Sequence, residues 1–211
     1  KEVRESILDG SYKYCDEKQC PYLSGLKNNK LSSKFVKKDT KSLQSFGTHK
    51  KIKTVNFCFD RSCNFQCPSC RSELINYYGK DREQVEVKLK EITDEISSTV
   101  KILYLTGTAD PFYSKSFREF LEKLDSTKFK KLESIHLHTN GSLWNEKMWN
   151  RLSAIHPYVK TCEISIDAGT KKTYETKTRI GGKWDVLLEN LKFITTIDTI
   201  QFFSFSFVVQ D

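Results

Sequence analysis

The sequence predicts an α/β fold in which five to six parallel strands form a partial (β/α) barrel with the helices outside. One observation is that short apolar segments of period two alternate with longer segments of helical period, which is typical of parallel strands joined by crossover helices. A second is that each predicted strand has one apolar and one polar face, whereas the strands of a sheet covered on both faces are apolar throughout. We therefore expect a curved sheet with helices against its apolar face and a ligand on its polar, concave face.

Five segments have the alternation of side chains that a strand requires. They span residues 52–59, 101–106, 132–138, 161–167 and 200–209. The residues on their polar faces are Asn56, Cys58 and Asp60; Tyr104 and Thr106; His136, His138 and Asn140; Glu163, Ser165 and Asp167; and Ser204, Ser206 and Gln210. Parallel strands need long crossovers, so the intervening segments are expected to be helical. These predicted helices lie near residues 82–97, 114–124, 144–153 and 184–195.

The composition is that of a globular protein, with 37% hydrophobic and 29% charged residues among 211. It excludes collagen-like, low-complexity and strongly disordered chains. No apolar run approaches the roughly 18 residues of a membrane span, and no signal-peptide pattern begins the chain, so we expect no membrane span and no secretion signal. The net charge of +8 is spread along the sequence and does not specify an acidic partner.

The chain divides into three parts by composition. Residues 22–50 are rich in Lys, Ser and Asn and have little periodicity, which indicates a linker. The regular alternation covers residues 51–211, which we expect to form the core, and residues 1–21 form a separate tail that carries Cys15 and Cys20.

Three of the seven cysteines form a dense cluster. Cys63, Cys67 and Cys70 have the spacing C-x3-C-x2-C and directly follow the first predicted strand. Three thiolates on one loop can hold three irons of a [4Fe–4S] cluster and leave the fourth iron without a protein ligand. A structural zinc site usually has four ligands, and no fourth ligand follows Cys70, but a zinc knuckle and a set of free thiols remain as alternatives.

This segment resembles the radical S-adenosylmethionine (radical SAM) superfamily. The resemblance implies two cofactors, a [4Fe–4S] cluster and S-adenosyl-L-methionine, whose reductive cleavage produces a 5′-deoxyadenosyl radical that abstracts a hydrogen atom from the substrate. It also implies an electron donor for the cluster and a peptide, sugar or other small molecule as substrate. An exposed cluster with an open iron predicts oxygen sensitivity, so we expect a cytoplasmic protein.

Further segments resemble the motifs with which this family binds the cofactor. Residues 106–112 resemble its Gly-Gly-Glu motif, with Thr-Ala-Asp in place of Gly-Glu. Residues 139–141 match a rim segment, and residues 165–168 resemble a Ser-x-Asp segment that contacts the ribose or the methionyl carboxylate. Residues 179–184 resemble an Arg-x-Gly-Gly-x-Trp segment, whose arginine is either a partner of the cofactor carboxylate or a solvated helix-cap residue. The cofactor-binding candidates are Gly107, Thr108, Asp110, Asn140, Ser165, Asp167 and Arg179.

Both ends of the chain suggest a fragment. Residues 1–21 resemble the tail of a SPASM domain, in which Cys15 and Cys20 would be auxiliary cluster ligands, or else structural thiols, because two thiolates cannot fill a four-ligand site. Five strands are predicted where the family usually has six. The apolar last strand is therefore expected to pair with a missing segment or a partner chain.

Several side chains and functions are left open. His136 and His138 either contact the substrate or are hydrogen-bonded interior residues, and Cys162 is expected in the core. One alternative function is a catalytically inactive relative that binds the cofactors as a scaffold or recognition module. Another is a zinc-binding nucleic-acid module, which the charge favours but which lacks a fourth ligand and an aromatic-basic motif on a strand.

Overall fold

The computed structural model describes residues 6, 11–14, 52–105 and 109–209, and it divides the chain into two compact units, 1–51 and 52–211. In the first unit, the backbone amide of Tyr12 donates a 2.8 Å hydrogen bond to the carbonyl of Ser6. The predicted linker and both tail cysteines lie outside the described residues, so the tail and linker stay predictions.

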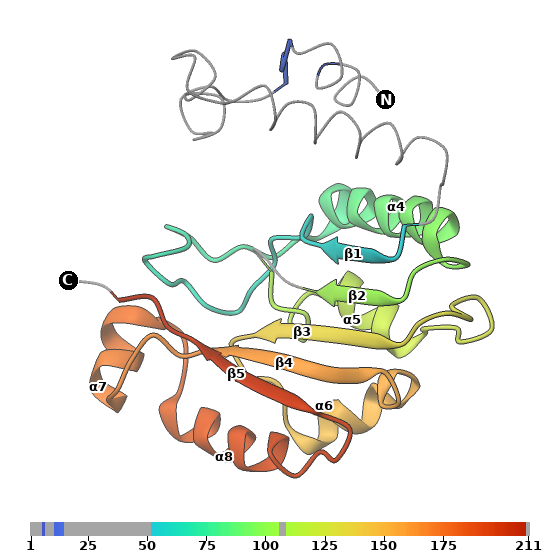
Figure 1. The fold of residues 1–211 in the computed structure, drawn as a ribbon. Coiled ribbons are helices and arrows are strands. Elements are labelled where there is room, and N and C mark those ends of the chain that lie inside the picture. Colours follow the sequence, from blue (N-terminus) through green and yellow to red (C-terminus); the bar gives the residue numbers. More distant parts are fainter. Residues whose placement is uncertain (1–5, 7–10, 15–51, 106–108, 210–211) are drawn as a thin grey trace, which may run out of the picture. The chain divides into compact units, whose positions relative to one another are not determined.

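The second unit contains five parallel strands in one sheet (Figure 1), in the order β1-β2-β3-β4-β5. They are β1 (Thr54–Phe57), β2 (Ile102–Leu105), β3 (Ser134–Thr139), β4 (Val159–Ser165) and β5 (Phe202–Ser206). Each strand pairs in parallel with its neighbour along the chain, and within the described residues β1 and β5 are the two edges. This confirms the predicted α/β fold with an open, parallel sheet.

A helix follows each of the first four strands, as predicted. The helices are α4 (Gly79–Ile96), α5 (Lys115–Glu122), α6 (Glu146–Arg151), α7 (Lys171–Thr173) and α8 (Trp184–Ile194). Side chains cap the N-termini of α5 and α6. At α5, the hydroxyl of Ser114 accepts a 3.1 Å hydrogen bond from the amide of Phe117. At α6, the side chain of Asn145 accepts a 2.9 Å hydrogen bond from the amide of Met148. The sequence did not predict α7, the 3₁₀-helix η1 (Ser153–Ile155) or the π-helix η2 (Tyr174–Thr178). Within the described residues, no helix combines the length and apolar character that a membrane crossing needs.

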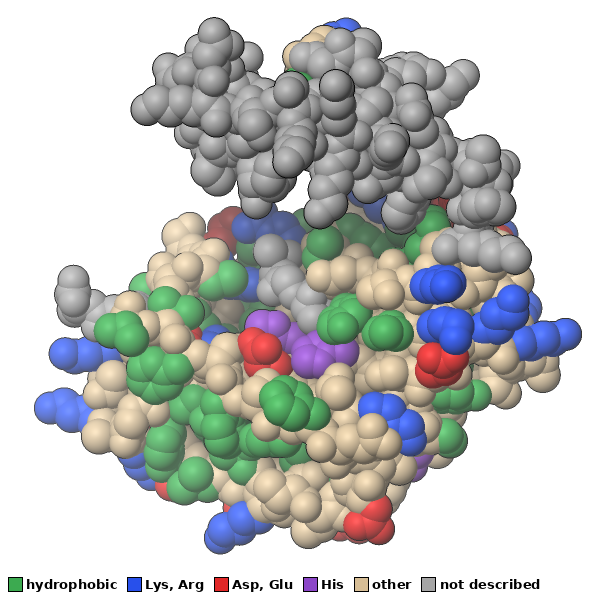
Figure 2. Space-filling view, viewed as in Figure 1, with side chains coloured by type: hydrophobic (Ala, Val, Ile, Leu, Met, Phe, Trp, Pro, Cys, Tyr) green, Lys and Arg blue, Asp and Glu red, His purple; other side chains and the backbone are tan. Residues whose placement is uncertain are grey.

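The helices lie against the apolar face of the sheet (Figure 1). Its fully buried strand residues are Phe57, Leu103, Leu105, Ile135, Leu137, Val159, Cys162 and Ile164. Fully burying a side chain of this size stabilises the fold by about 1.5–3 kcal/mol. The other face carries the half-buried side chains of His136, His138 and Glu163. Figure 2 views this face, with histidine side chains at its centre beside an acidic group. The predicted division into an apolar and a polar face is therefore present.

Three expectations about the strand ends and helix starts were wrong. β3 ends at Thr139 and β4 ends at Ser165, so Asn140 and Asp167 lie in loops. Asp167 has a φ of 54°, which is not a β-strand conformation. Trp144 precedes α6 and is fully buried. On the edge strand β5, Phe205 is 55% exposed.

Candidate functional site

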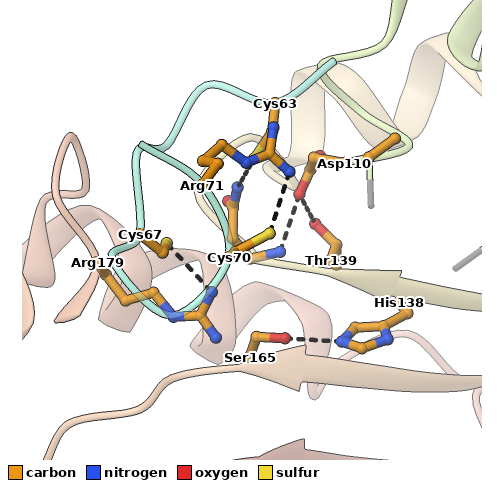
Figure 3. Close-up of a pocket in the computed structure, with 11 residues that line it drawn as sticks. Cys63, Cys67, Cys70, Arg71, Asp110, His138, Thr139, Ser165 and Arg179 are labelled. Carbon is orange, nitrogen blue, oxygen red and sulfur yellow. Dashed lines mark hydrogen bonds between the residues drawn. The ribbon is translucent and has the colours of Figure 1, made fainter. Parts of the chain in front are cut away.

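The three clustered cysteines lie in the loop that joins β1 to α4, at the carboxyl edge of the sheet. They line one pocket together with side chains from the loop after β2, from the end of β3 and the loop after it, from the end of β4, and from the segment after η2 (Figure 3). The other residues that line it are Arg71, Ala109, Asp110, His138, Thr139, Asn140, Ser165 and Arg179. Parallel strands bring their carboxyl ends to one edge, which explains how segments more than a hundred residues apart meet here.

Buried hydrogen bonds hold the start of the cysteine loop in place. The carboxylate of Asp60 is 1% exposed and accepts hydrogen bonds from the amide of Ser62, at 2.7 Å, and from the hydroxyl of Ser114. The amide of Cys63 donates to the carbonyl of Ile75 at 2.9 Å. The loop is therefore tied to the start of α5 and to its own return segment.

Asp110 connects two of the loops around the pocket. Its carboxylate is 1% exposed and accepts four hydrogen bonds, from the amides of Phe112, Tyr113 and Asn140 at 3.0, 3.2 and 2.9 Å and from the hydroxyl of Thr139 at 2.7 Å. Burial raises the pKa of Asp110, and these hydrogen bonds oppose that shift because they stabilise the ionised form. Four donors therefore surround the carboxylate of Asp110, a residue that the sequence predicted to bind the cofactor.

Arg179 lies between a carboxylate and a cysteine sulfur. Its Nη2 is 2.8 Å from Oδ2 of Asp167, and its Nη1 donates to Sγ of Cys67 at 3.5 Å. The other oxygen of Asp167 accepts a 2.8 Å hydrogen bond from the amide of Val208, just beyond β5. A chain of contacts therefore runs from the edge strand to the cysteine pocket.

The remaining two sulfurs also have nitrogen donors. Nη2 of Arg71 donates to Sγ of Cys70 at 3.5 Å, and Nδ2 of Asn140 donates to Sγ of Cys63 at 3.7 Å. The same Nδ2 donates to Oδ1 of Asn64 at 2.9 Å. Each of the three cysteines therefore accepts a hydrogen bond from a different residue.

Polar side chains continue from the pocket onto the sheet. Nε2 of His138 lies 2.7 Å from the hydroxyl of Ser165, which is 2.9 Å from the hydroxyl of Ser206. The same Nε2 is 3.6 Å from the carboxylate of Glu163. Burial lowers the pKa of the neighbouring His136, while the charge of Glu163 opposes that shift. These groups offer hydrogen bonds to a ligand that extends from the pocket over the sheet.

Two of the three thiols, Cys63 and Cys67, are in surroundings that favour their protonated form when no metal is bound. Burial, assisted by the charge of Asp110, raises the pKa of Cys63 to about 11. Burial also raises the pKa of Cys67, and the guanidinium of Arg179 opposes this shift. Metal ligation requires thiolates, so binding at this site must release protons.

Two observations test whether an iron–sulfur cluster fits these residues. Among the described residues, no group of three or more His, Cys, Asp or Glu side chains is arranged around a single metal ion, but each cysteine of a [4Fe–4S] cluster binds a different iron. In addition, Arg179 lines the pocket and its Nε is buried without a hydrogen-bond partner in the described structure. Three thiols beside two guanidinium groups, one with an unused donor, fit an anionic cluster.

The structure places most of the predicted site residues together. Four of them line the cysteine pocket: Asp110, Asn140, Ser165 and Arg179. Asp167 forms an ion pair with Arg179. Gly107, Thr108, Cys15 and Cys20 lie outside the described residues, and their roles stay predictions. Sequence reasoning missed Arg71 and Thr139 as pocket residues, and the position of Arg71 directly after the third cysteine was the signal that could have identified it.

Comparisons with known proteins give the following similarities. A family model described as the radical SAM superfamily matches residues 58–202. A curated relative, 7-carboxy-7-deazaguanine synthase of Aquifex aeolicus (strain VF5), is 31% identical over 98 residues. That match covers 46% of this chain and 40% of the relative, so the chain spans less than half of that protein's length. A solved structure of Streptococcus suis SuiB bound to the precursor peptide SuiA is 14% identical with a TM-score of 0.49, over 78% of this chain and 35% of that one.

Proposed function

This chain belongs to the radical SAM superfamily, and from that membership we propose that it binds a [4Fe–4S] cluster through Cys63, Cys67 and Cys70 and S-adenosylmethionine beside them. The observation that carries the proposal is that these three thiols, from one loop, line a single pocket with polar groups from three other loops. When bound, the two cofactors supply a 5′-deoxyadenosyl radical that abstracts a hydrogen atom from a substrate.

The protein's own contribution is to hold the cysteine loop against the loops that face it. The amide of Gln66, between two of the cysteines, donates to the carbonyl of Ile180 at 2.9 Å. At Gly182, an added Cβ would lie 2.9 Å from Phe65 and 2.6 Å from Tyr174, so the missing side chain permits this close approach. Such tight contacts restrict movement of the thiols before a cluster binds.

For S-adenosylmethionine, we propose contacts with the polar residues that border the pocket. Asn140, Ser165 and Arg179 line it directly, and Asp167 orients Arg179. The four donors around Asp110 favour a supporting role for that carboxylate, which holds the loops after β2 and β3. Gly107 and Thr108 remain our candidates for the amino group of the cofactor.

The substrate is proposed to lie over the polar face of the sheet next to the pocket. His138 borders the pocket and is hydrogen-bonded to Ser165, and the carboxylate of Glu163 lies beside it with 32% of its side chain exposed. These are hydrogen-bonding groups suited to a peptide, a sugar or another polar small molecule. An electron donor must also reach the site, and a cluster with an open iron predicts oxygen sensitivity.

The test is anaerobic reconstitution of the full chain with iron and sulfide, followed by a reductant and S-adenosylmethionine. We expect iron and acid-labile sulfide to be incorporated, and 5′-deoxyadenosine to form. Cys63→Ser, Cys67→Ser and Cys70→Ser should each lose most of the iron. Cys58→Ser and Cys162→Ala are matched controls outside the pocket and should retain it.

Each contrary result has its own meaning. Folded protein that takes up zinc but no iron and sulfide would contradict the proposal and favour the zinc-binding alternative. A cluster without cleavage of the cofactor would favour an inactive relative. Iron loss from both control variants as well would mean that the binding does not depend on the three clustered cysteines.

A further inference from the structure

Each of the three clustered sulfurs accepts a hydrogen bond from its own nitrogen donor (Figure 3 labels two of these pairs). Arg179 donates to Cys67 and Arg71 donates to Cys70, both at 3.5 Å, and a side-chain amide donates to Cys63 at 3.7 Å. The donors come from three different segments of the chain. Two of them carry a full positive charge.

The two guanidinium groups are held in position by further contacts. Nη2 of Arg179 is 2.8 Å from the carboxylate of Asp167, which is 3% exposed and accepts the amide of Val208. Nη1 of Arg71 donates to the carbonyl of Arg61 at 2.7 Å. Carboxylates and carbonyls that orient the groups around a metal ligand in this way tune the metal as well as position it.

We propose that Arg179 and Arg71 raise the reduction potential of the cluster bound by Cys63, Cys67 and Cys70, so that the cluster accepts an electron more readily. The inference rests on the proposed function, because it presumes that a cluster binds there. Reduction by a low-potential one-electron donor adds one negative charge to the cluster and neither forms nor breaks a covalent bond to the protein. Hydrogen bonds to the sulfurs and nearby positive charge stabilise the reduced, more negative state.

The two arginines should not contribute equally. The side chain of Arg179 is 12% exposed and contacts the buried Cys67, whereas Cys70 beside Arg71 is exposed. Water and salt screen a charge at an exposed site far more than at a buried one. Asp167 offsets part of the charge on Arg179 but keeps its N–H group directed at the sulfur. We therefore expect the larger effect from Arg179.

This role differs from the two that the sequence left open for Arg179, which were a partner of the carboxylate of S-adenosylmethionine and a solvated helix-cap residue. A residue that binds the cofactor affects the cluster when the cofactor is present. A residue that donates to a ligand sulfur changes the reduction potential in the absence of the cofactor. The two roles are therefore distinguishable by the same titration performed with and without S-adenosylmethionine.

The experiment is a redox titration of the reconstituted full chain, without S-adenosylmethionine, followed by electron paramagnetic resonance. Arg179→Gln and Arg71→Gln should both lower the midpoint potential relative to wild type, with the larger shift for Arg179→Gln. Arg179→Lys, which keeps the charge but loses the planar fork, should give an intermediate shift. Arg151→Gln is the matched control, because it removes an arginine that is ion-paired to Glu122 at 2.7 Å and is not among the residues lining the pocket.

Unchanged midpoint potentials in both arginine variants would overturn the inference. The inference would also be overturned if Arg179→Gln left the midpoint potential unchanged but bound S-adenosylmethionine more weakly. That result would mean that Arg179 binds the cofactor. If Arg179→Gln loses its circular dichroism signal or its cluster, the midpoint potential of Arg71→Gln, a substitution at a more exposed position, tests the inference. Failure of wild-type protein to form any cluster would instead overturn the proposed function itself.

Discussion

The carboxylate of Asp110 and the hydroxyl of Thr139 are joined by a 2.7 Å hydrogen bond that ties the loop after β2 to the end of β3. The same carboxylate also accepts three backbone amides. One buried side chain thereby holds two of the loops that form the cysteine pocket, and its substitution should affect the stability of the fold.

Asp110→Asn is expected to lower the free energy of unfolding. The NH2 group of the new side chain would face a backbone N–H, and two donors cannot form a hydrogen bond with each other. Each buried donor left without a partner costs about 1–3 kcal/mol. We expect this cost to exceed the free energy gained by removing a buried charge. Chemical denaturation of the cofactor-free protein measures the effect. Asp94→Asn is the control, since Asp94 lies in an exposed ion pair with Lys90 and should change stability by less than about 1 kcal/mol. Equal stabilities of the two variants would contradict a supporting role for Asp110.

Gly182→Ala is expected to destabilise the contact between the cysteine loop and the segment after η2. The added Cβ would lie 2.6 Å from Cε1 of Tyr174 and 3.0 Å from the carbonyl of Arg179, so neighbouring groups must shift. Overpacking of this kind costs about 1–3 kcal/mol. Gly169→Ala, where the added Cβ meets nothing within 4 Å, should leave the thermal midpoint nearly unchanged. A thermal melt that shows the same midpoint for both variants would argue against this close packing.

Tyr174→Phe is expected to stabilise the cofactor-free protein. The hydroxyl of Tyr174 is buried and has no hydrogen-bond partner in the described part of the chain, and an unpartnered buried hydroxyl costs about 1–3 kcal/mol. Denaturation should therefore require more urea for the variant. Tyr78→Phe, at a position that is 79% exposed, is the control and should have no effect. Destabilisation by Tyr174→Phe would indicate a hydrogen bond to this hydroxyl.

Stability is expected to fall as the pH decreases below about 6.5, the ordinary pKa of histidine. Burial lowers the pKa of His136 in the folded protein, so the unfolded chain binds a proton at this residue first. The stability that neutral His136 contributes is therefore present above the unfolded pKa and is lost as the pH falls through the lower, folded pKa. Urea denaturation at about pH 7.5 and about pH 5.5 measures the loss, and His136→Gln should reduce it. If the variant loses as much stability as wild type between these pH values, other groups cause the dependence.

The sequence could predict the strands and helices because their periods are local properties of the backbone. Alternation placed Leu103, Leu137 and Cys162 on the buried face correctly. It failed at the ends of elements, where a single loop conformation decides. Asp167 continues the alternation of β4 in the sequence, yet its left-handed backbone ends the strand and turns its carboxylate toward Arg179.

The sequence by itself also determined which thiols form the candidate cluster site, because Cys63, Cys67 and Cys70 lie close together in one loop. It did not determine what surrounds them. The contact between Arg179 and Cys67 joins residues 112 positions apart, and Asp110 accepts hydrogen bonds from four donors, two in its own loop and two at the carboxyl end of β3. Such contacts depend on how the helices and strands pack, since packing decides which loops meet at the carboxyl edge of the sheet. Only the tertiary structure could therefore assign a hydrogen-bond donor to each cysteine.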